Sequence, residues 1–440
     1  MNNQIGSDFT FKSFLRFTLP SMIMMFFISI YSTVDGLFIS NYVNADALSG
    51  LNIVWPIFNV IFSIIIMFAS GGSAIIAKKI GEKKPKEANK NFTLLIIISL
   101  ILGMILAVVG IIFLKPIVRL LGATDTLFQY AYDYGYYLLF FTPFIVLKTL
   151  YEYFLITAGN PKIGLLNTVL GGVINLVLDY IFIVHCNMGI AGASIATGIG
   201  FLIPAIIGTA YFLRKDANLK FTKTKLDFKL IIEAAINGSS EMVSNATLGI
   251  ITVLFNMLML NAYGENGVAA ISIIIYIQYA FAAIFFGFAS GAAPVIAYNY
   301  GEKNKILIKR LISYCFKFIG ITTVIIILIS IFSSSALIRL FTKDPDVIAI
   351  TESGIILYSL CYLTMGFNIM ASAMFTAFSN GKVSAIISML RSFVFVILCL
   401  KFLPLILPQA GLWLSIPIAE FLSVIISFMY IKKYKDIYGY

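Results

Sequence analysis

One loop pattern occurs twice in this chain, at a constant offset of 220 residues, as in Gly81 and Gly301. The pairs that obey the offset are Ser70-Gly71 and Ser290-Gly291, Gly81-Glu82-Lys83 and Gly301-Glu302-Lys303, Arg119-Leu120 and Arg339-Leu340, Asn160 and Asn380, and Lys162 and Lys382. Because three separate loops follow one offset, we predict a duplicated fold. The duplication also supplies an internal comparison, since a buried polar residue present in one half only is not required by the shared fold.

Hydrophobic residues make up 60% of the 440 residues and charged residues only 12%, a balance that a soluble protein could not hide from water. Apolar stretches of about 20 residues or more recur along the chain, and each is long enough to cross a bilayer as a helix. They lie near residues 14–40, 48–76, 91–114, 127–154, 164–184, 189–213, 229–262, 268–298, 309–332, 348–374, 383–407 and 410–432. We therefore predict an all-α polytopic membrane protein with about 12 transmembrane helices.

The net charge of +11 is distributed as a topology signal rather than as a surface for nucleic acid. Lys and Arg concentrate in alternate loops, most densely in 214–229, which predicts that these loops and both termini are cytoplasmic. Six helices return the chain to its starting side, so the halves should be parallel repeats related by a pseudo-twofold axis along the membrane normal. The predicted domains are an N-terminal six-helix lobe at 1–213, a cytoplasmic linker at 214–228 and a C-terminal six-helix lobe at 229–440.

The sequence argues against an enzyme. No GxxxxGK[ST] phosphate loop occurs, because the only Gly-Lys pair, Gly381-Lys382, is followed by Val383. One histidine and four widely spaced cysteines offer neither a metal knuckle nor a catalytic cluster. We expect no cofactor apart from a coupling ion, because duplicated membrane halves are typical of secondary transporters.

Four polar residues of the first half are predicted to meet inside the membrane. Asp35 lies in the first apolar stretch, and Asn175 and Asp179 are four residues apart, on one face of a helix. Thr197 lies on a stripe of small residues that allows a neighbouring helix to approach. Their counterparts at the offset are Phe255, Phe395, Cys399 and Pro417. Because the second half lacks these polar groups, we interpret them as a functional site; structural hydrogen bonds between helices are the alternative.

The chemistry of this site favours a small cation. Two carboxyl groups in a medium of low polarity cannot both stay ionised without compensation. The pair Asp35 and Asp179 can take up a proton, or the site can bind Na+ through carboxylate, amide and hydroxyl oxygens. We predict sodium, with the proton as the alternative. Either ion would change how three helices pack, which is how an ion gradient biases alternating access.

Three further residues predicted to lie inside the membrane, two glutamates and a methionine, have two interpretations each. The candidates for a substrate cavity are Glu241, Glu420 and Met257. A carboxylate in the cavity would attract cationic substrates, but either glutamate could instead pair with Arg391, and a methionine can simply pack. Lys148 and Glu152 are four residues apart, a spacing that predicts an ion pair on one helix face.

Three segments carry a resemblance to a known family: YSTVDGLFIS at 31–40, SGGSAIIAKKIGEKK at 70–84, and NLVLDYIFI followed by GIAGASIAT at 175–197. In this order and spacing the chain resembles the multidrug and toxic compound extrusion (MATE) family, especially the bacterial branches typified by the DinF and MepA exporters. The resemblance covers essentially the whole chain. It implies a V-shaped, two-lobe secondary active transporter that exchanges Na+ or H+ for amphipathic, often cationic, small molecules. It also assigns cation binding to the residues already singled out, Asp35, Asn175, Asp179 and Thr197.

The expected setting is the bacterial cytoplasmic (inner) membrane, where the chain would work as a monomer surrounded by lipid and would bind drugs or toxins but no nucleic acid. A flippase for lipid-linked oligosaccharides from the same superfamily is the alternative function. Such proteins tend to have fourteen helices and a cationic cavity, whereas the deep charges here are mostly acidic. A membrane-embedded enzyme is a more distant alternative, because it would need clustered catalytic side chains.

Overall fold

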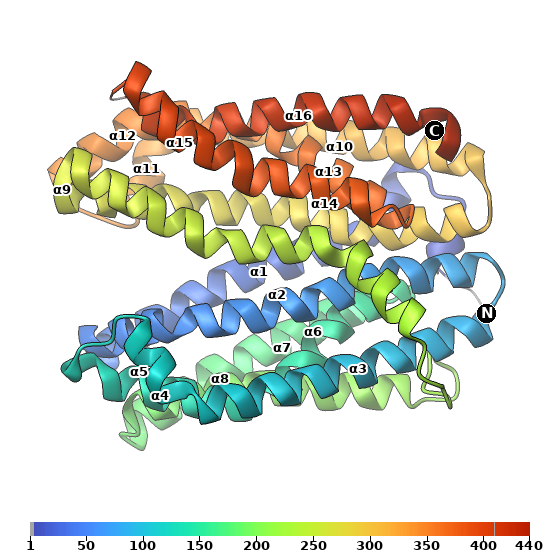
Figure 1. The fold of residues 1–440 in the computed structure, drawn as a ribbon, viewed down its shortest axis with the longest axis horizontal. Helices are drawn as coiled ribbons and strands as arrows, with labels where there is room; N and C mark the ends of the chain where they lie inside the picture. The colour runs from blue at the N-terminus through green and yellow to red at the C-terminus, as the bar shows by residue number, and fades with distance from the viewer. Residues whose placement is uncertain (1–3, 409) are drawn as a thin grey trace.

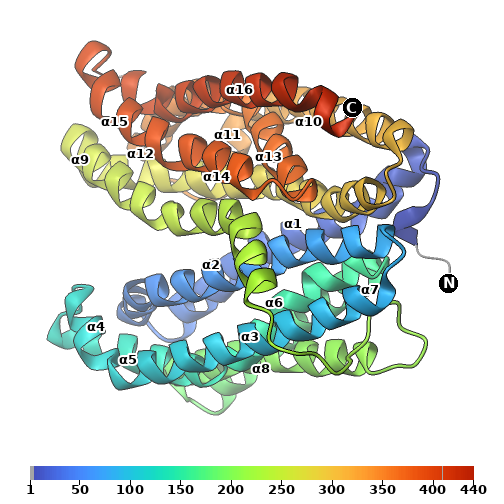
Figure 2. The same cartoon turned by 45° about the vertical axis from the view of Figure 1, so that its right-hand side comes forward.

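The computed structural model describes residues 4–408 and 410–440, and within them the chain is helical without a β-strand, as predicted. The N-lobe contains η1 (Gln4–Gly6), α1 (Phe11–Tyr42), α2 (Ala45–Gly81), α3 (Pro85–Ile112), α4 (Leu114–Leu120), α5 (Asp125–Phe140), α6 (Thr142–Thr157), α7 (Pro161–Asp179), η2 (Tyr180–His185) and α8 (Gly189–Phe212). The C-lobe contains α9 (Phe228–Gly301), α10 (Lys305–Phe332), α11 (Ser334–Arg339), α12 (Pro345–Ser359), α13 (Tyr362–Ala377), α14 (Gly381–Met389), η3 (Leu390–Val394), α15 (Phe395–Ile406) and α16 (Ala410–Tyr438). Figures 1 and 2 show the lobes side by side, with η1 and the C-terminus at the same end of the molecule. The predicted domain boundaries of 1–213, 214–228 and 229–440 stay a prediction.

The number of membrane spans agrees with the predicted twelve. Nine helices of the described chain are long and apolar enough to cross a membrane, or eleven when the bent pairs α5–α6 and α12–α13 each count as one span. Gly264 divides α9 into two arms because its φ of 65° is not helical, so α9 supplies two spans. Glycine adopts a positive φ at little cost because it has no Cβ.

Two predicted continuous spans are bent instead. The stretch 127–154 bends by 61° between α5 and α6, and the stretch 348–374 bends by 51° between α12 and α13. At the first bend Pro143 lies in the opening turn of α6, where its ring excludes a continuous helix. The second bend begins near Leu360, offset by 220 residues from Phe140, and has no proline there. The bend is therefore a property of the repeated fold.

Glycines at the lobe junction reproduce the pseudo-twofold symmetry. A side chain on Gly81 would overlap the carbonyl oxygen of Tyr298, and one on Gly301 would overlap that of Lys78. Because Lys78 and Tyr298 are themselves related by the offset, each lobe makes the same contact with the other. The same exchange relates two further close contacts, Gly71 with Gly238 and Gly291 with Thr18. Small residues of this kind allow helix backbones to approach within a membrane.

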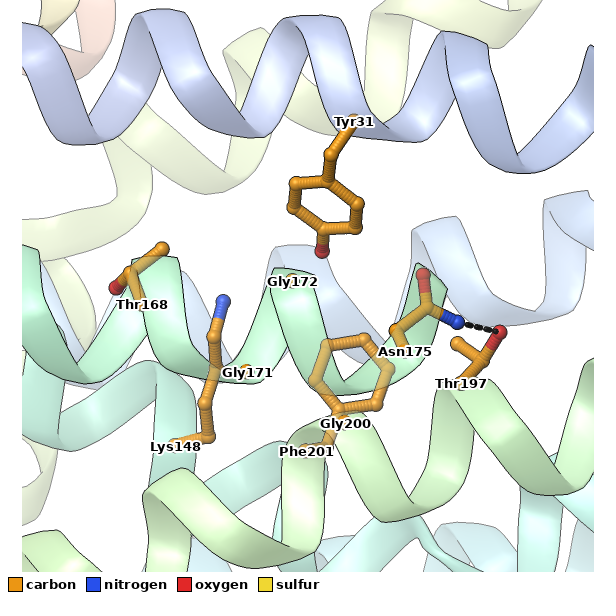
Figure 3. Close-up of a pocket in the computed structure, with 9 residues that line it drawn as sticks. All are labelled: Tyr31, Lys148, Thr168, Gly171, Gly172, Asn175, Thr197, Gly200 and Phe201. Carbon is orange, nitrogen blue, oxygen red and sulfur yellow. Dashed lines mark hydrogen bonds between the residues drawn. The ribbon is translucent and has the colours of Figure 1, made fainter. Parts of the chain in front are cut away.

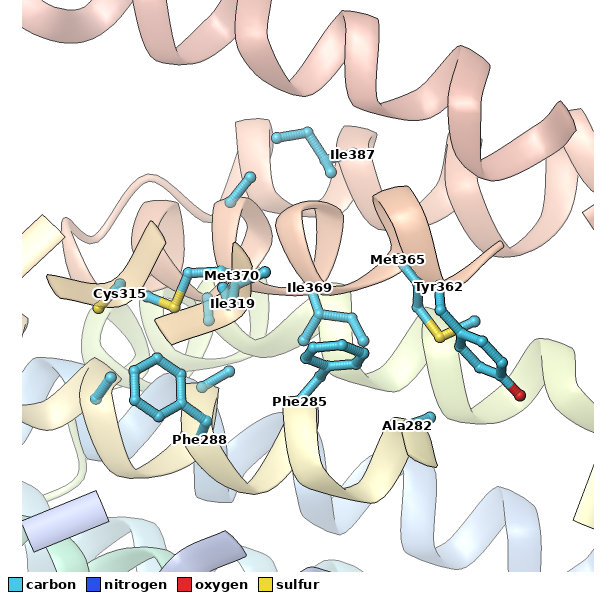
Figure 4. Close-up of a cluster of buried hydrophobic side chains, with 14 of the residues drawn as sticks. Ala282, Phe285, Phe288, Cys315, Ile319, Tyr362, Met365, Ile369, Met370 and Ile387 are labelled. Atoms are coloured by element: carbon cyan, nitrogen blue, oxygen red, sulfur yellow. The ribbon is translucent and has the colours of Figure 1, made fainter. Parts of the chain in front are cut away.

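Each lobe has its own hydrophobic core, and α1 contributes to both. Figure 4 shows part of the C-lobe core, where Phe288 of α9 and Met370 of α13 are buried together. The first half of α1 joins this core through Phe14, whose ring centroid lies 5.9 Å from that of Phe288. The second half of α1, at Ile39, joins the N-lobe core. The helix that carries Asp35 thus connects the two lobes.

Candidate cation site and buried ion pairs

The four residues predicted to form a cation site come together in the N-lobe. Asp35 is on α1, and Asn175 and Asp179 are on the last turns of α7. Thr197 is on α8, where its Oγ1 accepts a hydrogen bond of 3.2 Å from Asn175 Nδ2 (Figure 3) and donates one of 3.0 Å to the carbonyl of Ala193. The carboxyl groups of Asp35 and Asp179 are close enough to interact with each other and with the Asn175 side chain. A cation-binding role for this group stays a prediction.

Several oxygen atoms of this group are buried without a hydrogen-bond donor. They are Asp35 Oδ1, Asn175 Oδ1 and both carboxylate oxygens of Asp179, whose side chain is 0% exposed. Leaving one buried acceptor unpaired costs about 1–3 kcal/mol, and more when the group is charged. A small cation among these oxygens would satisfy them together. A proton shared between the two carboxyl groups would satisfy part of the set, so the choice between a cation site and structural hydrogen bonds stays a prediction.

Close packing of α7 on α8 sets the distance from Asn175 to Thr197. A side chain on Gly171 would lie 2.6 Å from the carbonyl oxygen of Gly200, and one on Gly200 would lie 2.9 Å from Asn175 Cβ. Only glycine allows these two backbones to approach so closely. Directly after Asp179 the chain forms the π-helical turn η2, a wide turn of a kind that is frequent at functional sites.

A small cavity of about 10 Å³ adjoins the site. Its volume is roughly the space that one water molecule needs. Asn175 and Thr197 line one end, and Lys148 and Thr168 line the other (Figure 3). At that end Lys148 Nζ lies 2.7 Å from Glu152 Oε1, which also accepts a hydrogen bond of 2.8 Å from Thr168 Oγ1. The predicted pairing of Lys148 with Glu152 is therefore confirmed.

In the C-lobe, Glu420 pairs with Arg391 rather than facing a cavity as a free carboxylate. Arg391 Nη1 lies 3.1 Å from Glu420 Oε1, and Asn368 Nδ2 donates a hydrogen bond of 2.7 Å to Glu420 Oε2. Ser427 Oγ in turn donates a hydrogen bond of 2.8 Å to Asn368 Oδ1. Of the two alternatives for Glu420, the structure selects the ion pair, because the polar atoms of its carboxylate are already satisfied.

The structure does not bring the three candidates for a substrate cavity together. Met257 is 58% exposed and lines a hollow of about 640 Å³ on α9, where Glu265 is the charged lining residue. Glu241 is partly buried and close enough to Arg391 for their charges to interact. Neither Glu241 nor Glu420 lines the hollow at Met257. A substrate-cavity role for Glu241, Glu420 and Met257 therefore stays a prediction.

The internal repeat relates the ion pairs of the two lobes. At the offset of 220, Arg391 and Glu420 take the positions of Gly171 and Gly200. The C-lobe thus places a salt bridge where two N-lobe backbones touch. In the other direction, Lys148, Glu152 and Thr168 correspond to Asn368, Ser372 and Ser388. The lobes share a fold but bury their charges on different helices.

One family model matches both halves of the chain. The model, described as MatE, covers residues 20–181 and 242–400, one segment in each lobe. The chain belongs to the MATE family. As a MATE protein it is a multipass membrane transporter and not an enzyme.

Relatives of this MATE protein include the Multidrug export protein MepA of Staphylococcus haemolyticus (strain JCSC1435). That protein is 26% identical over 391 residues, which cover 88% of this chain and 85% of the relative. The Multidrug export protein MepA of Staphylococcus aureus (strain MSSA476) is 23% identical over 430 residues, covering 97% of this chain and 94% of the relative.

Solved MATE structures confirm the two-lobe fold. A crystal structure of MATE in complex with MaD3S superposes with a TM-score of 0.92 at 22% identity, covering 100% of this chain and 99% of that one. The outward-facing conformation of a multidrug resistance MATE family transporter of the MOP superfamily gives a TM-score of 0.92 at 23% identity, with the same coverage. At this level of identity the likeness concerns the fold alone.

Two tyrosines beside the candidate site of this MATE protein escaped the sequence analysis. Tyr134 of α5 is fully buried and is close enough to Asp35 and Thr197 to interact with them. Tyr31 of α1 lines the small cavity (Figure 3). The spacing of four residues between Tyr31 and Asp35 was a usable signal. Nothing in the sequence indicated that α5 would approach this site.

Proposed function

We propose that this MATE protein is a secondary active multidrug efflux transporter that exchanges Na+ or H+ for amphipathic, often cationic, small molecules by alternating access. Its relatives are named multidrug export proteins. The observation that carries ion coupling is the set of buried oxygens on Asp35, Asn175 and Asp179 that lack a donor. We further propose that the transporter acts as a monomer in the bacterial cytoplasmic membrane with both termini in the cytoplasm.

In the proposed cycle a cation binds between α1, α7 and α8. The cation removes the repulsion between Asp35 and Asp179, which is strong in a medium of low polarity. A ligand shifts a conformational equilibrium only by its difference in affinity for the two states. The ion must therefore bind one orientation of the lobes more tightly, and its gradient then drives the return of the carrier after drug release.

We propose sodium as the coupling ion. Asn175 Nδ2 donates to Thr197, which leaves Asn175 Oδ1 without a donor and available as a ligand. Hard cations prefer carboxylate and carbonyl oxygens, and these are the atoms gathered here. A proton would need only the carboxyl groups and would leave the amide oxygen unsatisfied.

Transport in liposomes tests the proposal, with sodium and proton gradients imposed separately on purified protein and ethidium as the cationic substrate. Asp35→Asn should abolish gradient-driven ethidium transport while the protein remains folded, because the variant keeps the shape of the side chain and loses its charge. Cys399→Ser, at the position equivalent to Asp179, is the matched control and should transport normally. Full gradient-driven transport by Asp35→Asn would refute the cation site. Lipid movement without ethidium transport would favour the flippase alternative.

A further inference from the structure

Lys148 is a buried base that shares a cavity with the candidate cation site. Its side chain is 8% exposed, and its partner Glu152 is 6% exposed. Figure 3 shows the Lys148 amine ending beside α7 near Gly172, with Asn175 on the next turn of the same helix. Three residues of helix rise by about 4.5 Å, so a modest movement along α7 would bring the amine to Asn175.

The size of the cavity suits an ammonium group. Its volume is about 10 Å³, and Lys148 and Asn175 both line it. A site of this size holds roughly one water molecule, and a lysine ammonium is a compact charge on a flexible four-carbon stem. The oxygens beyond Asn175, on Asp35 and Asp179, lack donors and would accept hydrogen bonds from it.

The internal repeat shows that the residues bordering this cavity are specific to the N-lobe. The glycines that border the cavity, Gly171 and Gly200, are replaced in the C-lobe by Arg391 and Glu420. Those two side chains form a fixed pair, with 3.1 Å between Arg391 Nη1 and Glu420 Oε1. The C-lobe counterpart of Lys148 is the neutral Asn368. Of the two equivalent places, only the one in the N-lobe has a lysine beside two glycines. It is also the place where the oxygens of Asp35 and Asp179 lack partners.

We propose that Lys148 is a tethered cation that competes with the transported ion for the N-lobe acids. When the ion occupies the site, Lys148 pairs with Glu152. When the ion leaves, the Lys148 ammonium moves through the cavity toward Asn175 and Asp35 and supplies the missing positive charge. The ion-free carrier is then not left with two uncompensated carboxylates while it carries the drug outward. This inference rests on the proposed ion-coupled function.

Ion binding to purified protein tests the competition. The variant Lys148→Met/Glu152→Gln removes both members of the pair, so no unpaired buried charge threatens folding. Because the competitor is gone, sodium should bind roughly tenfold more tightly, equivalent to about 1.4 kcal/mol. Ser372→Ala, at the C-lobe position equivalent to Glu152, is the matched control and should bind sodium like the wild type; Asn368 is kept because it donates a hydrogen bond to Glu420.

A second variant guards against an indirect effect of removing the pair. Lys148→Arg retains the charge and the pairing with Glu152, but the guanidinium is too large for a space of one water molecule, so it should also tighten sodium binding. Unchanged or weaker sodium binding in both Lys148 variants would overturn the competition and leave the proposed function intact. A wild type that binds neither sodium nor protons at the acids would overturn both.

Discussion

Removal of Arg391 is expected to destabilise the C-lobe more than removal of its partner Glu420. The two side chains are 8% and 5% exposed, and breaking such a buried pair costs about 3–5 kcal/mol. In Arg391→Met, Glu420 keeps only the hydrogen bonds from Asn368, and Glu241 nearby adds a second acid without a base. We therefore expect Arg391→Met to lose the full amount, about 3–5 kcal/mol, in free energy of unfolding.

In Glu420→Gln, by contrast, Arg391 keeps the attraction of Glu241. The loss in free energy of unfolding for Glu420→Gln should therefore fall toward the roughly 1–3 kcal/mol of an imperfectly satisfied buried group. The double variant Arg391→Met/Glu420→Gln carries no charge at the pair, and replacing a whole buried pair by neutral groups is often without effect. We expect the double variant to lose less stability than Arg391→Met, because no charge of the pair is left buried and only Glu241 loses the attraction of Arg391.

The assay is the free energy of unfolding in detergent micelles for the wild type, both single variants and the double variant, read as a double-mutant cycle. A double variant whose loss equals the sum of the single losses would show that the two residues do not act as a pair. Equal losses in the two single variants would show that Glu241 contributes no compensating charge to Arg391.

Three further outcomes follow from the contacts described. Gly301→Ala should lower the free energy of unfolding by about 1–3 kcal/mol, because the added methyl group overlaps the other lobe. Gly249→Ala, whose surroundings are open, should not lower it. Similar losses in the two variants would contradict the close contact between the lobes. Glu241→Gln should raise the KM of cationic substrates roughly tenfold and leave neutral ones unchanged, whereas equal losses would indicate a structural role. Thr197→Val should weaken sodium binding roughly tenfold, and wild-type affinity would place Thr197 outside the site.

The repeat carried most of what the sequence could predict about the fold. The shared offset of Gly81 and Gly301 predicted the duplication, and six helices in each half predicted that the halves are parallel. The reciprocal contacts at Lys78 and Tyr298 agree with both. The bends between α5 and α6 and between α12 and α13 could not be predicted as a pair. Pro143 marks one of them, but apolar composition runs unbroken through both.

The grouping of Asp35, Asn175, Asp179 and Thr197 was accessible because spacing on α7 and the cost of buried charge are both readable from sequence. The partner of Glu420 was not, because Arg391 and Glu420 lie on separate helices whose rotation is set by packing. The same holds for Tyr134, which reaches the site only through the position of α5. Sequence periodicity defines a helix face, but it does not define which face a distant helix presents.

The reciprocal contact of Gly81 with Tyr298 and of Gly301 with Lys78 has the form of a homodimer interface. When two identical proteins meet about a twofold axis, residue i of one touches residue j of the other, and j touches i. Here both partners belong to one chain, and the seam of such a dimer is preserved inside a single polypeptide. Duplication and fusion of a gene for a half that paired with itself would produce contacts related in this way, without any new binding chemistry.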